Sequence, residues 1–532
     1  MSASTPRAYL PTCDILVVGG GNAGFCAALS AAESSPRSRV VIVDKCPSSW
    51  AGGNSYFTAG AFRTAHAGLH DLLPLVNNTT PEQAARIDIP VYSEADFMHD
   101  MQRMTGGRTE PPLAKALVGE SRAAVGWLAK NGVRFQLSFN RQAYEVNGRI
   151  KFWGGMALKT QDGGKGLIED HMRAAARAGI QVVFDTAATK LVTCPESGAV
   201  LGVEVVTGGS TQKRQTMTIR AGAVVLAAGG FEANAQQRAQ YLGPGWDAAR
   251  VRGTPYNTGD VLALAQRDAG AKAVGNWSGC HCTAWDADAP AHAGDRAVSN
   301  EFTKSGYPLG IMVNRDGERF ADEGFDMRNY TYAMIGRRIL QQPGQVAFQV
   351  WDSRTISWLR EEEYRPEVTK HITGNTLEEL ADRCAEAGLQ DRQRFVQTIK
   401  EFNAAVPSDA EATRRWDPAV KDGLATKGLA VAKSNWALRI DKSPFLAVRV
   451  TAGITFTFGG LAVNPENSAV ISNVTGAEIP GLYAAGEMVG GIFHDNYPGG
   501  SGLTSGAVFG RRAGKAAAQV ANRRGTTTSA RL

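Results

Sequence analysis

The chain has 532 residues, a length that indicates two or three domains rather than one. Hydrophobic residues make up 43%, as is ordinary for a globular protein, and the net charge of +6 is small for this length. No dense cluster of Lys and Arg is interleaved with aromatic residues, which argues against nucleic-acid binding. No apolar run approaches the length of a membrane span, so we expect no integral membrane segment.

Residues 14–44 have the pattern of a β-α-β unit, with an apolar run, a glycine turn, an alanine-rich helical stretch and a second apolar run. Gly19, Gly21 and Gly24 form a GxGxxG motif between strand and helix, where glycines permit a tight turn, close approach of a pyrophosphate and close helix packing. Asp44 ends the second strand, where a carboxylate can accept hydrogen bonds from a ribose. The unit predicts a dinucleotide site, and the motif alone does not separate NAD from FAD.

Helical patterns follow at 110–131 and 165–179, strand patterns run through 180–193 and 199–209, and 221–235 has the pattern of a buried strand that runs into a glycine turn. After residue 275 the composition changes, and Trp, Asp and Pro replace the Gly- and Ala-rich strand patterns. Thr376 with Glu379 predicts a capping box at the start of a helix in this segment. Glycine-rich strands return near residue 456. We therefore expect an α/β fold: a Rossmann-type FAD-binding domain (12–278 and 446–522) carrying an inserted α+β substrate-capping domain (279–445), with tails at 1–11 and 523–532.

Seven cysteines are scattered without a CxxC pair, which favours reduced thiols and a cytoplasmic location. Cys280-His281-Cys282 lacks a second ligand pair at zinc spacing, so we expect no metal site there. The final residues, Ala530-Arg531-Leu532, are a loose variant of a peroxisomal address, which would matter if the source were eukaryotic.

Several motifs, taken in order, carry a family resemblance: DILVVGGGNAG, GGNSYFTAGA, VVLAAGGFEAN, NTGD, VNRDGERFADE and GLYAAGEMVGG followed by NYPGGSGLTSGAVFGRRAG. Nearly the whole chain resembles the fumarate reductase/succinate dehydrogenase flavoprotein superfamily. Within it, GNWSGCH, GITFTFGG and NYPGGSGLT are most similar to FAD-dependent tricarballylate dehydrogenase.

The resemblance implies FAD as cofactor. Asn54 stands where succinate dehydrogenase has the histidine that bonds to the flavin, which implies non-covalent binding. The cofactor contacts expected from the motif and the resemblance are Gly19, Gly21, Asn22, Ala23, Gly24, Asp44, Lys45, Gly53, Asn54, Ser55, Gly60, Ala188, Ala228, Gly229, Asp260, Glu487, Gly500, Ser501 and Leu503.

For catalysis, His281 and Arg328 match one of the two substrate-binding histidines and the proton-transferring arginine of the family's fumarate reductases. Phe456 stands in place of the second histidine, and Tyr497 in place of the carboxylate-binding arginine. This departure implies a catalytic set of Arg328, His281 and Tyr497 that acts on a substrate other than fumarate. The further candidates are Thr455, Thr457, Arg63 and His66 for substrate binding, and Glu301, Asp322 and Glu323 for relaying protons.

The leading hypothesis is therefore an FAD-dependent dehydrogenase or reductase of a C–C bond next to a carboxylate, with tricarballylate to cis-aconitate first. A second hypothesis is a 3-ketosteroid-type or other enone enzyme, because those relatives also carry a YPG loop whose tyrosine binds a carbonyl. A third is a flavoprotein subunit that passes electrons to a redox protein or quinone, since the chain has no cluster motif of its own to accept them. A fourth is a flavin-binding protein without catalysis.

Overall fold

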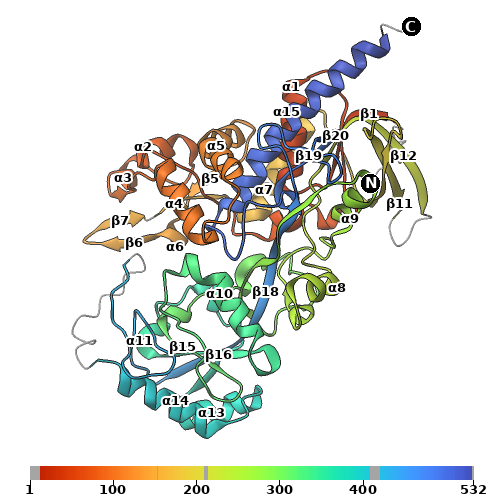
Figure 1. Ribbon diagram of the computed structural model, residues 1–532. Coiled ribbons are helices and arrows are strands. Elements are labelled where there is room, and N and C mark those ends of the chain that lie inside the picture. Colours follow the sequence, from red (N-terminus) through yellow and green to blue (C-terminus); the bar gives the residue numbers. More distant parts are fainter. Residues whose placement is uncertain (1–11, 153, 209–213, 408–419, 530–532) are drawn as a thin grey trace, which may run out of the picture.

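The computed structural model describes residues 12–152, 154–208, 214–407 and 420–529. It has two parts (Figure 1): an α/β main domain that contains both the first and the last described elements, β1 (Thr12–Val18) and α15 (Ser501–Ser529), and a cap, which we define as residues 287–444. The C-terminal helix α15 runs from the interior of the main domain to its outer edge.

The main sheet has eight strands and a parallel centre. β1 (Thr12–Val18) lies between β2 (Val40–Val43) and β12 (Gln215–Leu226), and both pairings are parallel. β9 (Gln181–Val183) extends the sheet beyond β2, and β20 (Glu478–Ala484) joins the C-terminal half of β12. The antiparallel strands β10 (Thr186–Thr193), β11 (Val200–Thr207) and β19 (Ala469–Ile471) complete it. Central residues such as Ile15, Leu16 and Val17 are fully buried, as expected for a sheet covered on both faces.

Two helices from opposite ends of the chain cover this sheet together. α1 (Asn22–Ser34) packs along α15, and glycines recur on α15 every fourth residue at Gly506, Gly510 and Gly514. A Cβ atom added at Gly514 would lie 2.1 Å from the Ala27 carbonyl oxygen. The backbones therefore approach at a distance that only glycine allows.

The remaining elements of the main domain surround this core. The helices are α2 (Leu69–Leu72), α3 (Pro81–Ala84), α4 (Glu94–Thr105), α5 (Pro111–Lys130), α6 (Phe139–Gln142), α7 (Gly163–Arg177), α8 (Ala235–Gln237) and α9 (Asp260–Ala269). Two small sheets contain β3 (Ala61–Phe62), β8 (Leu158–Thr160) and β5 (Phe135–Leu137), and β4 (Ile87–Asp88), β7 (Arg149–Phe152) and β6 (Ala143–Val146). The helices predicted at 110–131 and 165–179 correspond to α5 and α7.

A second sheet links the main domain to the cap. β18 (Phe445–Leu461) pairs with β16 (Ala347–Asp352) and β17 (Ile372–Gly374) in the cap, and with β14 (Ala273–Asp286) and β13 (Arg250–Val251) beside the main domain. β15 (Ile311–Asn314) completes the sheet. The predicted boundary at 278/279 lies inside β14 and the one at 445/446 at the start of β18, so the chain passes between the two parts along paired strands. The domain limits themselves stay a prediction.

The cap helices are α10 (Arg328–Leu340), α11 (Ser353–Ile356), α12 (Glu361–Tyr364), α13 (Leu377–Glu386) and α14 (Arg392–Ala405). Thr376 caps α13 by accepting the Glu379 amide at 3.0 Å, whereas the Glu379 carboxylate accepts the Asn375 amide, so the predicted capping box is incomplete.

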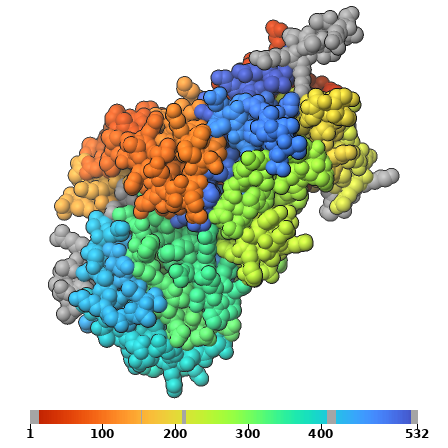
Figure 2. Space-filling model, viewed as in Figure 1, coloured from red at the N-terminus to blue at the C-terminus, as the bar shows by residue number. Residues whose placement is uncertain are grey.

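The cap rests against the segment that includes α4 and α5, orange against green and cyan in Figure 2. Arg103 on α4 pairs with Asp326 at 2.9 Å and lies 3.8 Å from the Tyr330 ring centroid. Asn496 donates to the Tyr330 carbonyl at 2.8 Å. These contacts hold the start of α10 close to the loop containing Tyr497.

Within the described ranges, no helix is both long and apolar enough to cross a membrane. The same part of the chain contains no group of three His, Cys, Asp or Glu side chains arranged to hold a metal. Ala530-Arg531-Leu532 and the tail 1–11 lie outside the described residues.

Candidate active site

A long cavity runs from the glycine turn after β1 to the inner ends of β14 and β18. Most of the predicted cofactor residues line it: Gly19, Gly21, Asn22, Ala23, Asp44, Lys45, Gly53, Asn54, Ser55, Ala188, Ala228, Gly229, Asp260, Glu487, Gly500 and Leu503. Segments near residues 20, 50, 230, 260 and 490 thus converge on one space. These residue assignments stay predictions, but the structure brings their positions together.

The glycine turn has the geometry expected for an anion site. Gly19 has φ +108°, and a Cβ there would lie 2.4 Å from the Ala227 carbonyl oxygen. A Cβ at Gly21 would meet nothing closer than the Ser55 hydroxyl at 3.6 Å, so this glycine leaves room beside the N-terminus of α1. The turn therefore fits the pyrophosphate of a dinucleotide.

Three predicted cofactor residues lie outside the cavity wall. A Cβ at Gly24 would lie 1.9 Å from the Gly19 carbonyl oxygen, so this glycine serves helix packing. Gly60 has φ +74° and packs against Thr160, while the Ser501 hydroxyl donates to the Pro498 carbonyl at 2.6 Å, at the start of α15. They shape the cavity from behind.

Asn54 is part of a buried polar cluster. Its side-chain amide donates to Glu232 and to the Thr455 carbonyl, and its oxygen accepts the Thr254 amide at 2.8 Å. Because an amide side chain lacks a nucleophilic ring nitrogen, this position cannot form the bond that a histidine forms with a flavin. The amide instead links the main domain to β18.

Glu232, fully buried, and Glu487, half-buried, form a pair of neighbouring carboxyl groups. Thr457 donates to Glu487 through its amide at 2.7 Å and its hydroxyl at 3.1 Å, so that hydroxyl is already engaged. Burial raises the pKa of Glu487 to about 7, and burial together with the charge of Glu487 raises the pKa of Glu232 well above its ordinary value. We conclude that the pair retains a proton near neutral pH.

At the opposite end of the cavity, aromatic rings surround Tyr497. Its ring centroid lies 4.8 Å from His281 and 5.0 Å from Phe456. The Tyr497 hydroxyl makes no hydrogen bond to any described residue, and burial raises its pKa to about 12. His281 is buried with Nδ1 unpartnered among the described atoms, and burial lowers its pKa well below the usual value. Both side chains are therefore neutral at pH 7 and free to bond to a ligand.

The cavity wall also includes residues that were not predicted from the sequence, among them Arg141, Arg252 and Tyr332. Arg252 lies just before the NTGD motif that the resemblance contains, and Tyr332 lies one helical turn after Arg328. Arg141 is on α6 and forms ion pairs with Glu362 at 3.7 Å and Glu363 at 3.8 Å in the cap. Sequence proximity was the signal available for Arg252 and Tyr332, whereas Arg141 had none.

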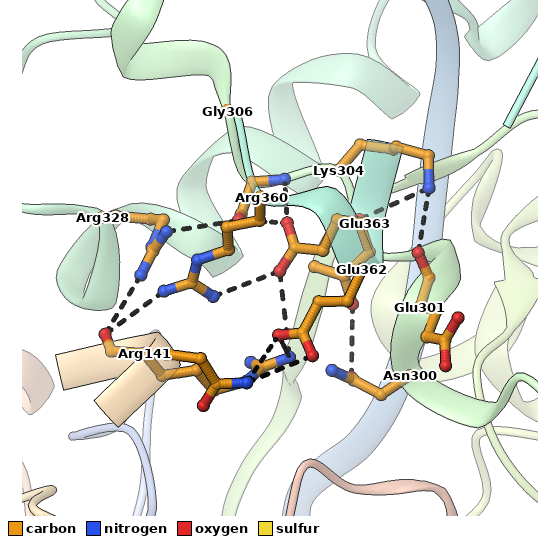
Figure 3. A network of polar contacts seen from close by, with 12 residues as sticks. Arg141, Asn300, Glu301, Lys304, Gly306, Arg328, Arg360, Glu362 and Glu363 are labelled. Atoms are coloured by element: carbon orange, nitrogen blue, oxygen red, sulfur yellow. Dashed lines mark hydrogen bonds and ion pairs between the residues drawn. The ribbon is translucent and has the colours of Figure 1, made fainter. Parts of the chain in front are cut away.

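Arg328 lies outside this cavity and lines a smaller one beside it (Figure 3). Its guanidinium lies 3.5 Å from both the Ser305 hydroxyl and the Arg141 carbonyl. Ser305 also contacts Glu363, a fully buried carboxylate that Arg360 approaches at 3.2 Å. Burial alone would lower the pKa of Arg328, but Tyr332 and Glu363 outweigh that effect and raise the pKa. Arg328 is thus a charged group behind Tyr332.

The other sequence candidates lie away from the cavity. Arg63 is buried, donates to the Gly499 carbonyl at 2.8 Å and pairs with Asp100 at 2.7 Å. His66 is buried and accepts the Gly68 amide at 3.3 Å. Both side chains were expected to contact an anionic substrate, and instead Arg63 packs under the Gly499 loop while His66 lies against Tyr92 with a ring-centroid distance of 6.0 Å.

The candidate relay carboxylates are engaged in the cap. Glu301 pairs with Arg365, Glu323 with Arg319 at 2.5 Å, and Asp322 bonds to Ser434. Thr455 and Thr457 do line the cavity, as predicted for substrate-binding residues, although the Thr455 hydroxyl accepts a bond from Arg252 at 3.0 Å.

Together, the parallel sheet, the glycine turn and a cavity that extends to an inserted cap define a dinucleotide-binding flavoprotein of the oxidoreductase class. The chain belongs to the FAD binding domain family FAD_binding_2, whose model matches residues 14–503.

Three similarities illustrate this family. The chain is 28% identical to the probable fumarate reductase Ifc3 of Shewanella frigidimarina (strain NCIMB 400) over 512 residues, which is 96% of this chain and 75% of the relative. It is 27% identical to 4-oxocyclohex-2-ene-1-carboxylate 5-dehydrogenase of Sinomonas cyclohexanicum over 602 residues, covering 96% and 95%. The open conformation of a flavocytochrome c3 fumarate reductase superposes with a TM-score of 0.69 at 26% identity, covering 96% and 78%.

The protein is therefore an FAD-dependent oxidoreductase, and the predicted fold class and superfamily are confirmed. The more specific assignment to tricarballylate dehydrogenase stays a prediction. The residues fit FAD: the turn at 19–21 suits its pyrophosphate, Asp44 suits a ribose, and the Gly499–Gly500 loop with Leu503 suits the flavin end.

Proposed function

We propose that this enzyme adds or removes hydrogen across a C–C bond next to a carboxylate, with tricarballylate and its product cis-aconitate as the first substrate pair to test. Bound FAD supplies the acceptor or donor of two electrons. The observation that carries the proposal is the pair of free, neutral groups, Tyr497 and His281, at the end of the cavity beside the loop 494–502.

Tyr497 and His281 polarise the substrate in this proposal. The Tyr497 hydroxyl donates a hydrogen bond to a carbonyl or carboxylate oxygen, because its pKa of about 12 keeps it protonated. Neutral His281 donates or accepts according to its tautomer. Hydrogen bonds to this oxygen acidify the adjacent C–H bond, which makes proton removal from one carbon easier while its neighbour loses hydride.

The proton leaves by way of Tyr332 in this proposal, with Arg328 as the charged group behind it. Tyr332 lines the cavity, and Arg328 contacts Ser305 and, through Ser305, Glu363 (Figure 3). Because the pKa of Arg328 is raised, the cation stabilises negative charge on Tyr332 or on the substrate rather than acting as a free base. Glu363 is the carboxylate through which the proton exchanges.

A cyclic enone carboxylate is the second candidate. Phe456, Phe458 and Phe493 surround Tyr497 with ring centroids 5.0, 6.5 and 5.4 Å away, which suits a ring better than a flexible chain. The Sinomonas relative is named for a substrate of this kind. A neutral 3-ketosteroid would leave the half-buried arginine of the cavity, Arg252, without an anion.

The test is anaerobic flavin bleaching. Purified yellow enzyme is mixed with tricarballylate, a 4-oxocyclohexanecarboxylate or a 3-ketosteroid, and dithionite-reduced enzyme is mixed with cis-aconitate or fumarate. We expect bleaching by a saturated carboxylate or reoxidation by an unsaturated one. Bleaching by the steroid alone would contradict the carboxylate proposal, and no response to any compound would support a flavin-binding protein without this catalysis.

Reduced flavin must then pass its electrons on, and we propose a quinone or a redox protein as acceptor. The chain carries no haem or cluster motif of its own. Substrate-reduced enzyme should reoxidise slowly in air and rapidly with a quinone or cytochrome. Air reoxidation as fast as turnover would remove the need for a partner.

A further inference from the structure

Arg252 is placed in the cavity wall by strand pairing. It directly follows β13, which pairs in parallel with β18, and its amide donates to the Ile454 carbonyl at 2.9 Å. This bond sets Arg252 beside Thr455, close to the end of the cavity that contains Tyr497 and His281.

The guanidinium of Arg252 contacts neutral groups. It donates to the Thr455 hydroxyl at 3.0 Å and to the Asn300 side-chain oxygen, and it lies 5.3 Å from the Trp285 ring centroid. Its Nε atom is buried without a partner among the described residues, as is the Thr283 hydroxyl in the same cavity. No carboxylate of the described chain lies at ion-pair distance from this guanidinium.

Several other arginines with little exposed side chain are balanced, whereas Arg328 shares with Arg252 an Nε atom unpartnered among the described residues but lines the smaller cavity beside Ser305. Arg63 pairs with Asp100, Arg319 with Glu323 and Arg354 with Asp352. Arg238 lies outside the cavity and donates to four backbone carbonyls. Arg252 has neither a carboxylate nor a full set of acceptors.

Arg252 is half-buried with its Nε atom enclosed, and a cation partly shielded from water without a counter-ion is costly. The cost is relieved when a ligand supplies the negative charge. Burial lowers the pKa of Arg252 to about 10, so the side chain still carries its charge at neutral pH. The guanidinium offers paired N–H groups that match the two oxygens of a carboxylate.

We infer that Arg252 is the residue that binds a substrate carboxylate, with the Thr283 hydroxyl as a second donor. The inference deepens the proposed function: the carboxylate held by Arg252 positions the substrate so that its polarised oxygen reaches Tyr497 and His281. In this view Arg252 takes the role for which the sequence suggested Arg63 and His66.

The test measures binding without turnover. Oxidised, FAD-loaded enzyme is titrated with cis-aconitate and with benzoate, neither of which has an adjacent pair of saturated C–H carbons to desaturate, and with their amides, while flavin absorbance is recorded. We expect the wild type to bind at least one of these carboxylates more tightly than its amide. Arg252→Gln should weaken that carboxylate about 100-fold and change amide binding by less than about threefold.

Arg250→Gln is the matched control, since Arg250 lies two residues away, outside the cavity, and donates to the Ala287 carbonyl at 3.0 Å. It should bind as the wild type does. Arg252→Lys should restore part of the affinity, because it restores the charge without the paired N–H geometry. FAD content and the melting temperature are measured for each variant.

Equal carboxylate affinity in wild type and Arg252→Gln overturns the inference. If Arg252→Gln loses FAD, the wild type and Arg252→Lys decide: wild-type preference for the carboxylate together with weakened binding in Arg252→Lys supports the inference, and any other result overturns it. Failure of the proposed function looks different. Carboxylates would then bind through Arg252 while no compound bleached or reoxidised the flavin.

Discussion

At the scale of single residues, the substrate end of the cavity places uncharged hydrogen-bonding groups and charged groups on different side chains. Its substrate end has neutral Tyr497 and His281, the cation Arg252 and, behind the wall, the cation Arg328. Uncharged donors can stabilise an oxygen on which charge develops, whereas a cation binds the charge that a substrate already has. The two functions therefore lie on different residues.

Arg328→Ala should lose flavin bleaching by about 10²–10⁴-fold while the protein stays yellow, because the proton path loses the charge behind Tyr332. Tyr332→Phe should slow bleaching similarly if the path passes through this hydroxyl. Stopped-flow absorbance measures both. Arg338→Ala, an exposed arginine on the same helix, is the control, and an unchanged rate in Arg328→Ala would remove Arg328 from the mechanism.

Glu232→Gln should stabilise the protein more at pH 8 than at pH 5. The folded-state pKa values of both carboxyl groups are raised, that of Glu487 to about 7, so the stability contribution of the neutral forms is fully present below about pH 4.5 and is lost as pH rises through the folded-state values. The amide keeps the acceptor for Asn54 and Asn257 and carries no charge. Melting temperatures of the holoenzyme across this pH range check it. The exposed Glu466→Gln should show no such trend, and a pH-independent difference for Glu232→Gln would contradict the assignment.

Local features of the site were predictable from the sequence, and distant ones were not. The glycine turn at 19–24 was predictable because strand, turn and helix are contiguous. Arg252 was not, because its place depends on pairing with β18, about two hundred residues later in the chain. Arg63 and His66 follow the predicted cofactor segment 53–60 in sequence, yet Tyr92 and Asp100 hold Arg63 away from the cavity.

At the scale of elements, the contact of α1 with α15 ties the two ends of the chain together. The glycines of α15 that face α1 lie directly behind the dinucleotide turn, since a Cβ at Gly506 would lie 2.9 Å from the side-chain nitrogen Nδ2 of Asn22. The apolar and glycine pattern of residues 14–44 predicted α1, whereas α15 was not predicted as a helix. The closeness of their approach was not predictable, since glycine spacing alone does not identify the helix that faces it.

Gly514→Ala should lower the free energy of unfolding by about 1–3 kcal/mol, because the new methyl group meets the Ala27 carbonyl. Gly119→Ala is the matched control, as this glycine lies exposed inside α5 with no atom closer than 4.0 Å to the added Cβ. The control should gain about 0.5–1 kcal/mol from helix propensity. Urea titration measures both. Stabilisation by Gly514→Ala would mean that the helices lie further apart than described.

At the scale of the whole molecule, the cofactor cavity collects segments from both ends of the chain and from the cap side. Removal of FAD should therefore lower the melting temperature. Added FAD should raise it again as its concentration rises, because at a hundredfold excess over Kd it stabilises the folded state by about 2.7 kcal/mol. Thermal melts of stripped enzyme with FAD, riboflavin or no addition test this. Full restoration by riboflavin would show that the dinucleotide turn contributes nothing.

The ladder of β14 and β18 has one more consequence. Asp286 and Val450 are paired in the antiparallel ladder of β14 and β18, so the 163 residues between them begin and end at adjacent positions on these two strands. Such an attachment lets evolution, or an engineer, exchange the intervening segment for that of a relative while the register of β14 and β18 is kept. Chimaeras joined at this pair would inherit FAD binding from one parent and the outer wall of the substrate chamber from the other.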